Sequence, residues 1–187
     1  NACASGSSAV IGAAAMIRSG EAEIAIALGA EKLTRPGGGF LPIVADDLES
    51  AMGRVMPAAF AMQAQLHMQR YGTTREQMAQ VAVKNRRNGA LNPRCHFKEE
   101  VTVEQVLASP AIAEPLTRLS CCPVSDGGAA FIVSRAPVND FGVRISGAGQ
   151  AHLHQHVTMA GDVTRYGAAD ACGRAIDASG VTLKDID

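Results

Sequence analysis

A cysteine near the start of the sequence is the residue best placed to do chemistry. Cys3 precedes a run of small and apolar residues, 7–18, that is typical of a helix buried on all sides. The start of a helix carries partial positive charge and amide groups without intrahelical partners, so it stabilises a thiolate and an oxyanion. Small neighbours at Ala2, Ala4 and Gly6 leave room for a substrate. This pattern indicates a nucleophile for acyl transfer, with a buried structural cysteine as the alternative.

The elements that would position Cys3 follow an α/β order. Gly20 is a stop for the first helix, and the stretch 22–30 is apolar without strict alternation, which is typical of a central strand covered on both faces. A helix followed directly by such a strand is an α/β unit. Further along, the sequence predicts a strand at 129–133, another at 143–149 and a helix at 167–179 that Gly180 ends.

The sequence between the first two strands predicts helices. Pro57 is placed in the first turn of a helix that runs to about Tyr71. Thr74 with Gln77 forms a capping-box pattern, which predicts a second helix to about residue 87. The same pattern recurs before a short helix that ends near 109–110. We therefore expect a mostly helical insertion between two strands.

The composition of the 187-residue chain excludes several classes of protein. Its 17 lysines and arginines nearly balance 18 aspartates and glutamates, and the net charge of −1 argues against nucleic-acid binding and a polybasic membrane anchor. Hydrophobic residues make up 47%, which excludes disorder as the main state. The apolar runs 9–17 and 24–30 are too short to cross a bilayer. Five cysteines without regular spacing favour a reduced, cytoplasmic location.

Histidine and cysteine clusters give little support for a metal. His152, His154 and His156 alternate, so on a strand they would share a face, but no further ligand spacing accompanies them. The adjacent pair 121–122 has no CxxC partner. We expect no bound metal and no bound cofactor.

Three motifs, in order along the chain, resemble the thiolase family. The stretch 1–10, which contains Cys3, resembles the nucleophile motif of the sterol-carrier-protein-2-type branch. Ala51-Met52-Gly53, followed by residues 57–60, is similar to the start of the helix that contacts pantetheine. The stretch 119–130 resembles the end of the thiolase loop domain, where the chain returns to the sheet. The resemblance covers essentially the whole chain.

The resemblance implies a partial thiolase-like α/β fold, with parallel or mixed sheets between helices and a mostly helical loop insertion. Residues 1–33 would form the second half of the N-terminal thiolase domain, and residues 34–125 the helical loop domain. Residues 126–136 would be the return strand of the N-terminal domain, and residues 137–187 the start of the C-terminal thiolase domain. We expect an internal fragment of a longer enzyme.

The resemblance also implies a function, that of an acyl-CoA C-acyltransferase in lipid metabolism, such as an acetyl-CoA acetyltransferase. Cys3 would carry the acyl group, with acyl-CoA and CoA as substrates, in thiolysis of a 3-ketoacyl-CoA or in the reverse Claisen condensation. Met52 and Cys122 would contact pantetheine, Cys122 standing where ordinary thiolases have a serine. The family implies a homodimer or a higher oligomer.

Other functions stay open at this point. Some members of this branch are retro-aldolases or subunits that need an OB-fold partner, β-ketoacyl synthases share the fold and a cysteine nucleophile, and a non-catalytic lipid-binding or scaffold protein would keep the fold alone. The family's Gly-His-Pro, Cys-x-Gly and His-Asp-x-Phe motifs do not occur in the chain. The general base and the second cysteine are therefore expected beyond Asp187, and these residues alone are expected to be inactive.

Overall fold

Regular structure covers much of the chain. The computed structural model describes residues 2–34, 47–137, 142–152, 162 and 167–186. The chain divides into two units. The first unit comprises Asn1–Lys32, Asp126–His154 and Arg165–Asp187, and the second comprises Leu33–Ser125 and Gln155–Thr164. Each unit is described by itself.

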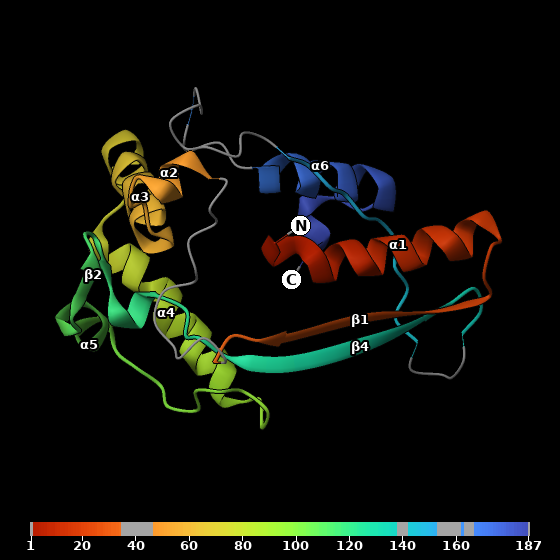
Figure 1. Ribbon diagram of the computed structural model, residues 1–187, viewed down its shortest axis with the longest axis horizontal. Helices are drawn as coiled ribbons and strands as arrows, with labels where there is room; N and C mark the ends of the chain where they lie inside the picture. The colour runs from red at the N-terminus through yellow and green to blue at the C-terminus, as the bar shows by residue number, and fades with distance from the viewer. Residues whose placement is uncertain (1, 35–46, 138–141, 153–161, 163–166, 187) are drawn as a thin grey trace. The chain divides into compact units, whose positions relative to one another are not determined.

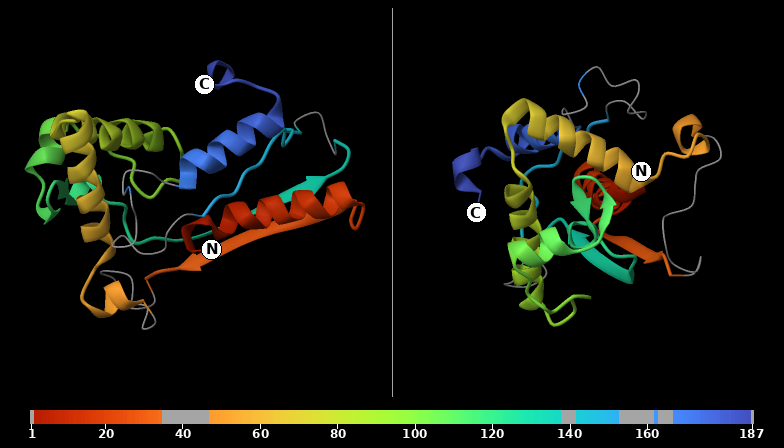
Figure 2. Two further views of the ribbon diagram at one scale, coloured as in Figure 1. Left: turned by 90° about the horizontal axis from the view of Figure 1, so that it is seen from above. Right: turned by 90° about the vertical axis from the view of Figure 1, so that its left-hand side faces the viewer.

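The described residues of the first unit form two long strands, two helices and two short 3₁₀ turns. These elements are η1 (Ala2–Ala4), α1 (Ser5–Ser19), β1 (Ile24–Lys32), β4 (Asp126–Ser134), α6 (Gly167–Ser179) and η4 (Leu183–Asp185). β1 and β4 are antiparallel, and their register runs from Ile24 opposite Ser134 to Lys32 opposite Asp126. α1 lies along this pair of strands (Figures 1 and 2).

The helix α1 begins and ends where its sequence predicts. Gly20 follows the last turn with a φ of 83°, a left-handed conformation that glycine adopts without steric cost. Small side chains let the helix approach the sheet closely, and Ala13, Ala14 and Ile17 are buried. Met16, however, is 47% exposed. The prediction of a helix buried on all sides is therefore wrong for the described residues, because only part of its circumference lies against the strands.

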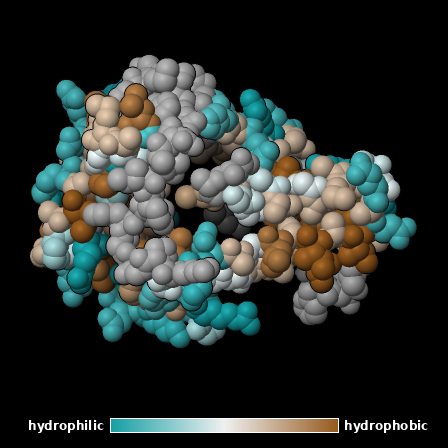
Figure 3. All heavy atoms as spheres, in the orientation of Figure 1, coloured by the Kyte–Doolittle hydropathy of each residue, from teal (hydrophilic) through white to brown (hydrophobic). Residues whose placement is uncertain are grey.

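The strand β1 also departs from its predicted burial. Ala27 is buried on the face that α1 covers, whereas Ile24, Ile26 and Leu28 on the opposite face are 62 to 68% exposed. Apolar side chains gather over the β1–β4 pair in Figure 3. The expectation of a strand covered on both faces is wrong for the described residues, because among them only one face has a helix against it.

The predicted strand at 143–149 is not formed in the described part of this segment, 142–152. Gly147 and Gly149 instead lie against α6, so close that a Cβ atom on Gly147 would overlap the carbonyl oxygen of Ala175. A Cβ atom on Gly149 would overlap that of Ala171. A strand is defined by a ladder of hydrogen bonds to a neighbouring strand. This segment contacts a helix instead, so the predicted strand is wrong for the described residues.

The second unit is mostly helical. Its elements are α2 (Leu48–Ala51), α3 (Met56–Tyr71), α4 (Arg75–Ala90), α5 (Val103–Ala108), β2 (Ala111–Ala113), β3 (Leu116–Thr117) and η2 (Arg118–Ser120). Pro57 lies in the first turn of α3, and Gly72 ends that helix with a φ of 70°, as predicted. Both predicted capping boxes, at Thr74 and Thr102, are confirmed.

The short helix α5 carries the most deeply buried side chain of this unit. Val106 is 1% exposed, and α5 lies against α4, η2 and β3. The hydroxyl of Thr117 donates to the carbonyl of Val106 at 2.7 Å, which ties the β2–β3 pair to the helix. The sequence did not predict this antiparallel pair, whose strands have three and two residues.

Candidate functional site

Cys3 lies immediately before α1, in the short turn η1. The thiol of Cys3 is exposed. The N-cap residue of α1 is Ala4, whose side chain makes no capping hydrogen bond. The partial positive charge of a helix start favours an anion at this place. The geometry therefore suits an accessible thiolate and the oxyanion that forms when it attacks a carbonyl.

Interactions near both ends hold α1 in place. Near its start, the side-chain amide of Gln150 donates to the hydroxyl of Ser8 at 2.7 Å, and Arg174 of α6 donates to the carbonyl of Gln150 at 2.5 Å. In its last turns, the guanidinium of Arg135 donates to the carbonyl of Ile17 at 2.9 Å. A cation at a helix C-terminus matches the helix dipole. The helix that follows Cys3 is thus anchored to the residue after β4 and to the glycine segment beside α6.

Met52 lies in the second unit, on the turn that follows α2. Its backbone amide donates to the carbonyl of Leu48 at 3.0 Å, and the residue is 80% exposed. Gly53 follows with a φ of 95°. A residue with a Cβ atom would be strained in this conformation, which glycine adopts freely in a turn. The turn presents a flexible apolar thioether outward.

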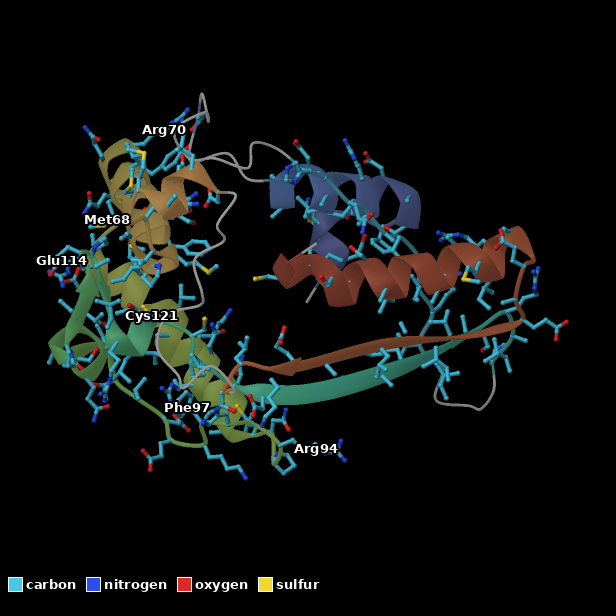
Figure 4. The ribbon with its side chains drawn as sticks, in the orientation of Figure 1. Met68, Arg70, Arg94, Phe97, Glu114 and Cys121 are labelled. Carbon is cyan, nitrogen blue, oxygen red and sulfur yellow. The ribbon has the colours of Figure 1, made fainter. Side chains whose placement is uncertain are left out.

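Cys122 also belongs to the second unit, where it follows η2 and is exposed. Its neighbour Cys121 is half-buried, and burial raises the pKa of the Cys121 thiol, with a further rise from the adjacent Cys122. Cys121 is therefore a weaker nucleophile than an ordinary thiol at neutral pH. Figure 4 shows Cys121 among the elements of the second unit.

An aromatic and polar cluster beyond α4 was not predicted from the sequence. The rings of His96 and Phe97 stack with centroids 4.6 Å apart, and the guanidinium of Arg86 lies 3.8 Å from the centroid of Phe97. The Nδ1 atom of His96 is 2.8 Å from the hydroxyl of Ser125. Figure 4 labels Phe97 at this place. The cluster joins the segment after α4 to the residue that precedes β4, and the adjacent His96-Phe97 pair was its only sign in the sequence.

The other candidate ligands stay apart or outside the described residues. His152 is exposed, and His154 and His156 lie outside the described residues. Among the residues that the structure describes, no three His, Cys, Asp or Glu side chains are grouped to hold a metal ion. None of the described helices is both long and apolar enough to span a membrane.

Comparison with known proteins identifies relatives of the chain. Residues 1–136 match the family described as "Thiolase, N-terminal domain". An acetyl-CoA acetyltransferase of Methanothermobacter thermautotrophicus is 38% identical over 100% of the chain, which spans 51% of that relative. Human sterol carrier protein 2 is 33% identical over 77% of the chain and 29% of its own length. The chain therefore spans about half the length, or less, of these relatives.

A solved structure gives the same fold. The structure described as "Ltp2-ChsH2(DUF35) aldolase" superimposes with a TM-score of 0.82 and 30% identity, over 98% of this chain and 51% of that one. The partial thiolase-like α/β fold is thereby confirmed. The site residues Cys3, Met52 and Cys122 stay predictions.

Proposed function

Because this chain belongs to the thiolase family, we propose that Cys3 is the nucleophile of an acyl-CoA C-acyltransferase. The observation that carries the proposal is the exposed thiol at the start of α1. Since the chain spans about half the length of its relative, the proposed activity is that of the complete protein.

In the degradative direction, the Cys3 thiolate forms a bond to the C3 carbonyl carbon of a 3-ketoacyl-CoA. The bond between C2 and C3 breaks, and its electron pair goes to C2, which takes up a proton as acetyl-CoA leaves. The thiolate of CoA then attacks the acyl-enzyme and releases a shortened acyl-CoA. Amide groups at the start of α1 would stabilise each oxyanion.

The substrate arm would lie against two exposed residues of the second unit. Met52 offers an adaptable apolar thioether to the pantetheine chain. Cys122 offers a small, weakly polar thiol from the segment after η2. Both assignments are proposals that follow from the resemblance of the motifs around them.

The test is capture of the acyl-enzyme on the complete protein. After brief incubation with acetoacetyl-CoA, mass spectrometry should find an acetyl group on the peptide that contains Cys3. The Cys3→Ala variant should lose both the adduct and thiolysis, whereas Cys172→Ala, which removes another exposed thiol, should keep both. An adduct on a different cysteine, or turnover by Cys3→Ala, would contradict the proposal.

A second function has its own support in the aldolase that superimposes on the chain. In that case the complete protein would be a retro-aldolase subunit, with a partner that the resemblance predicts to carry an OB fold. A retro-aldol reaction cleaves a 3-hydroxyacyl-CoA without free CoA and without an acyl group on Cys3. Cleavage that needs no free CoA and forms no acyl group on Cys3 would favour this second function. Binding of the acyl-CoA without any cleavage would favour a lipid-binding or scaffold protein.

A further inference from the structure

The turn that carries Met52 is closed by charged residues on both sides of it. The guanidinium of Arg54 forms ion pairs with two carboxylates: its Nη2 donates a hydrogen bond to Asp47 at 3.0 Å, and its Nε lies 2.7 Å from a carboxylate oxygen of Glu49. The backbone amide of Arg54 also donates to the carbonyl of Glu49 at 3.0 Å. Arginine is suited to this role because its planar donors can bind two acceptors at once, which the ammonium of lysine does with less directional control.

The acidic partners are held in place by the turn itself. Asp47 is the N-cap of α2, where its carboxylate accepts hydrogen bonds from the backbone amide and the hydroxyl of Ser50. The pKa of Asp47 lies below its ordinary value, mainly because its carboxylate accepts a hydrogen bond from the Ser50 hydroxyl. Burial opposes this effect by raising the pKa, and Arg54 lowers the pKa further. The carboxylate therefore stays charged at neutral pH.

Burial makes the arginine necessary. Asp47 and Glu49 are 9% and 8% exposed, and the side chain of Arg54 is 25% exposed. A buried carboxylate that loses its cationic partner is destabilising, and Asp47 and Glu49 share the one guanidinium. Loss of Arg54 would therefore remove the cation that links the two acids across the turn.

The residue in the middle of this turn is exposed. Met52 and Gly53 lie between the acids and the arginine, and the amide of Gly53 donates to the carbonyl of Ser50 at 3.0 Å. The buried charges hold the backbone on both sides, while the Met52 side chain, 80% exposed, is left outward. This contrast is expected of a support that presents a contact residue rather than of a surface ion pair.

We propose that Arg54 is a positioning residue for thioester binding, because by joining Asp47 to Glu49 it fixes the turn that presents Met52 to the pantetheine arm of an acyl-CoA. The inference rests on the proposed function and deepens it. Arg54 touches no reacting atom, so it acts on substrate binding and leaves the acyl-transfer step itself unchanged.

The experiment compares two thioesters on the complete protein. Arg54→Met should raise the KM for acetoacetyl-CoA about tenfold and change kcat less than about twofold. With acetoacetyl-N-acetylcysteamine, which lacks most of the pantetheine arm, kcat/KM should be unchanged. Arg70→Met removes an arginine from an exposed ion pair of the same unit and should behave as wild type on both substrates.

A double-mutant cycle separates positioning from general damage. In a protein that already carries Met52→Ala, Arg54→Met should add little to the KM, because the residue through which it acts is gone. If Arg54→Met does not fold by circular dichroism, Glu49→Gln takes its place, with a smaller rise in KM and an unchanged kcat. Equal losses on both thioesters, an unchanged KM, or full additivity with Met52→Ala would overturn the inference.

The outcomes distinguish this inference from the proposed function. If the wild-type protein acylates Cys3 and turns over both thioesters, but Arg54→Met and Glu49→Gln do not alter the KM, only the role of Arg54 fails. If the wild-type protein acylates Cys3 with neither thioester, the proposed function fails, and the role of Arg54 fails with it.

Discussion

The replacement of Val106 by alanine measures how strongly α5 is held in the second unit. Val106 is 1% exposed, so Val106→Ala removes two buried methyl groups. At about 0.8 kcal/mol for each group, the lost transfer free energy is about 1.6 kcal/mol. The cavity that remains adds to this cost, because neighbouring groups relax only in part. We expect the free energy of unfolding to fall by about 2–3 kcal/mol.

A matched control exists on the adjacent helix. Val81 of α4 is 56% exposed, so Val81→Ala removes the same groups from a site that is largely in contact with water. Alanine also has the higher helix propensity, and the free energy of unfolding should change by less than about 0.5 kcal/mol.

Urea denaturation of the complete protein, followed by circular dichroism, provides the comparison. The midpoint of the transition that unfolds the helical unit should fall for Val106→Ala at an unchanged m-value. Equal midpoints for the two variants would refute the reasoning, because they would show that Val106 is not part of a closed core. A lower m-value for Val106→Ala would mean that the unfolding transition itself had changed.

Three further changes have definite expected outcomes. Gly149→Ala should lower the melting temperature, because the added Cβ atom overlaps a carbonyl of α6, whereas Gly173→Ala on that helix meets no atom within 4 Å and should raise it slightly. Iodoacetamide near neutral pH, with peptide mapping, should label Cys3 before Cys121, whose pKa burial raises; the reverse order would contradict the site. Hydrogen bonds with its own backbone amide and, second, with the side chain of Thr102 lower the pKa of Glu104. The charged carboxylate therefore stabilises the fold at a pH above the ordinary pKa of glutamate, and this stabilisation is lost as the pH falls through the lowered pKa. Glu104→Gln should therefore reduce the urea midpoint at neutral pH, and the reduction should shrink as the pH falls below the ordinary pKa of glutamate; a reduction that does not change with pH would contradict this assignment.

Local sequence patterns predicted the helices well and the burial of the first unit poorly. Gly20, Pro57 and the two capping boxes act within one turn of the helix that they begin or end, so their effect is visible in a few neighbouring residues. The exposure of Ile26 depends on what lies against the strand, which the strand's own sequence does not contain.

The candidate site divides in the same way. Cys3 is visible in the sequence because its motif and the helix that follows it are contiguous. Arg54 has no periodic pattern around it, and its role depends on a turn that brings it back to Asp47. The contact between His96 and Ser125 joins residues 29 positions apart, so only the folded chain brings the two together. Sequence alone therefore predicted Cys3 as a candidate nucleophile and did not predict the contacts of Arg54 or His96.

The pairing of Lys32 with Asp126 has a consequence for how such a protein diversifies. These residues are opposite each other at the end of the β1–β4 ladder, and their side chains form an ion pair at 3.2 Å. The segment between them therefore leaves and re-enters the sheet at neighbouring points. Because loop-closure entropy grows only slowly with length, this excursion can lengthen, shorten or be exchanged with little effect on strand register. The segment between Lys32 and Asp126 can thus change while the β1–β4 ladder is kept, and a protein engineer can graft at the same two residues.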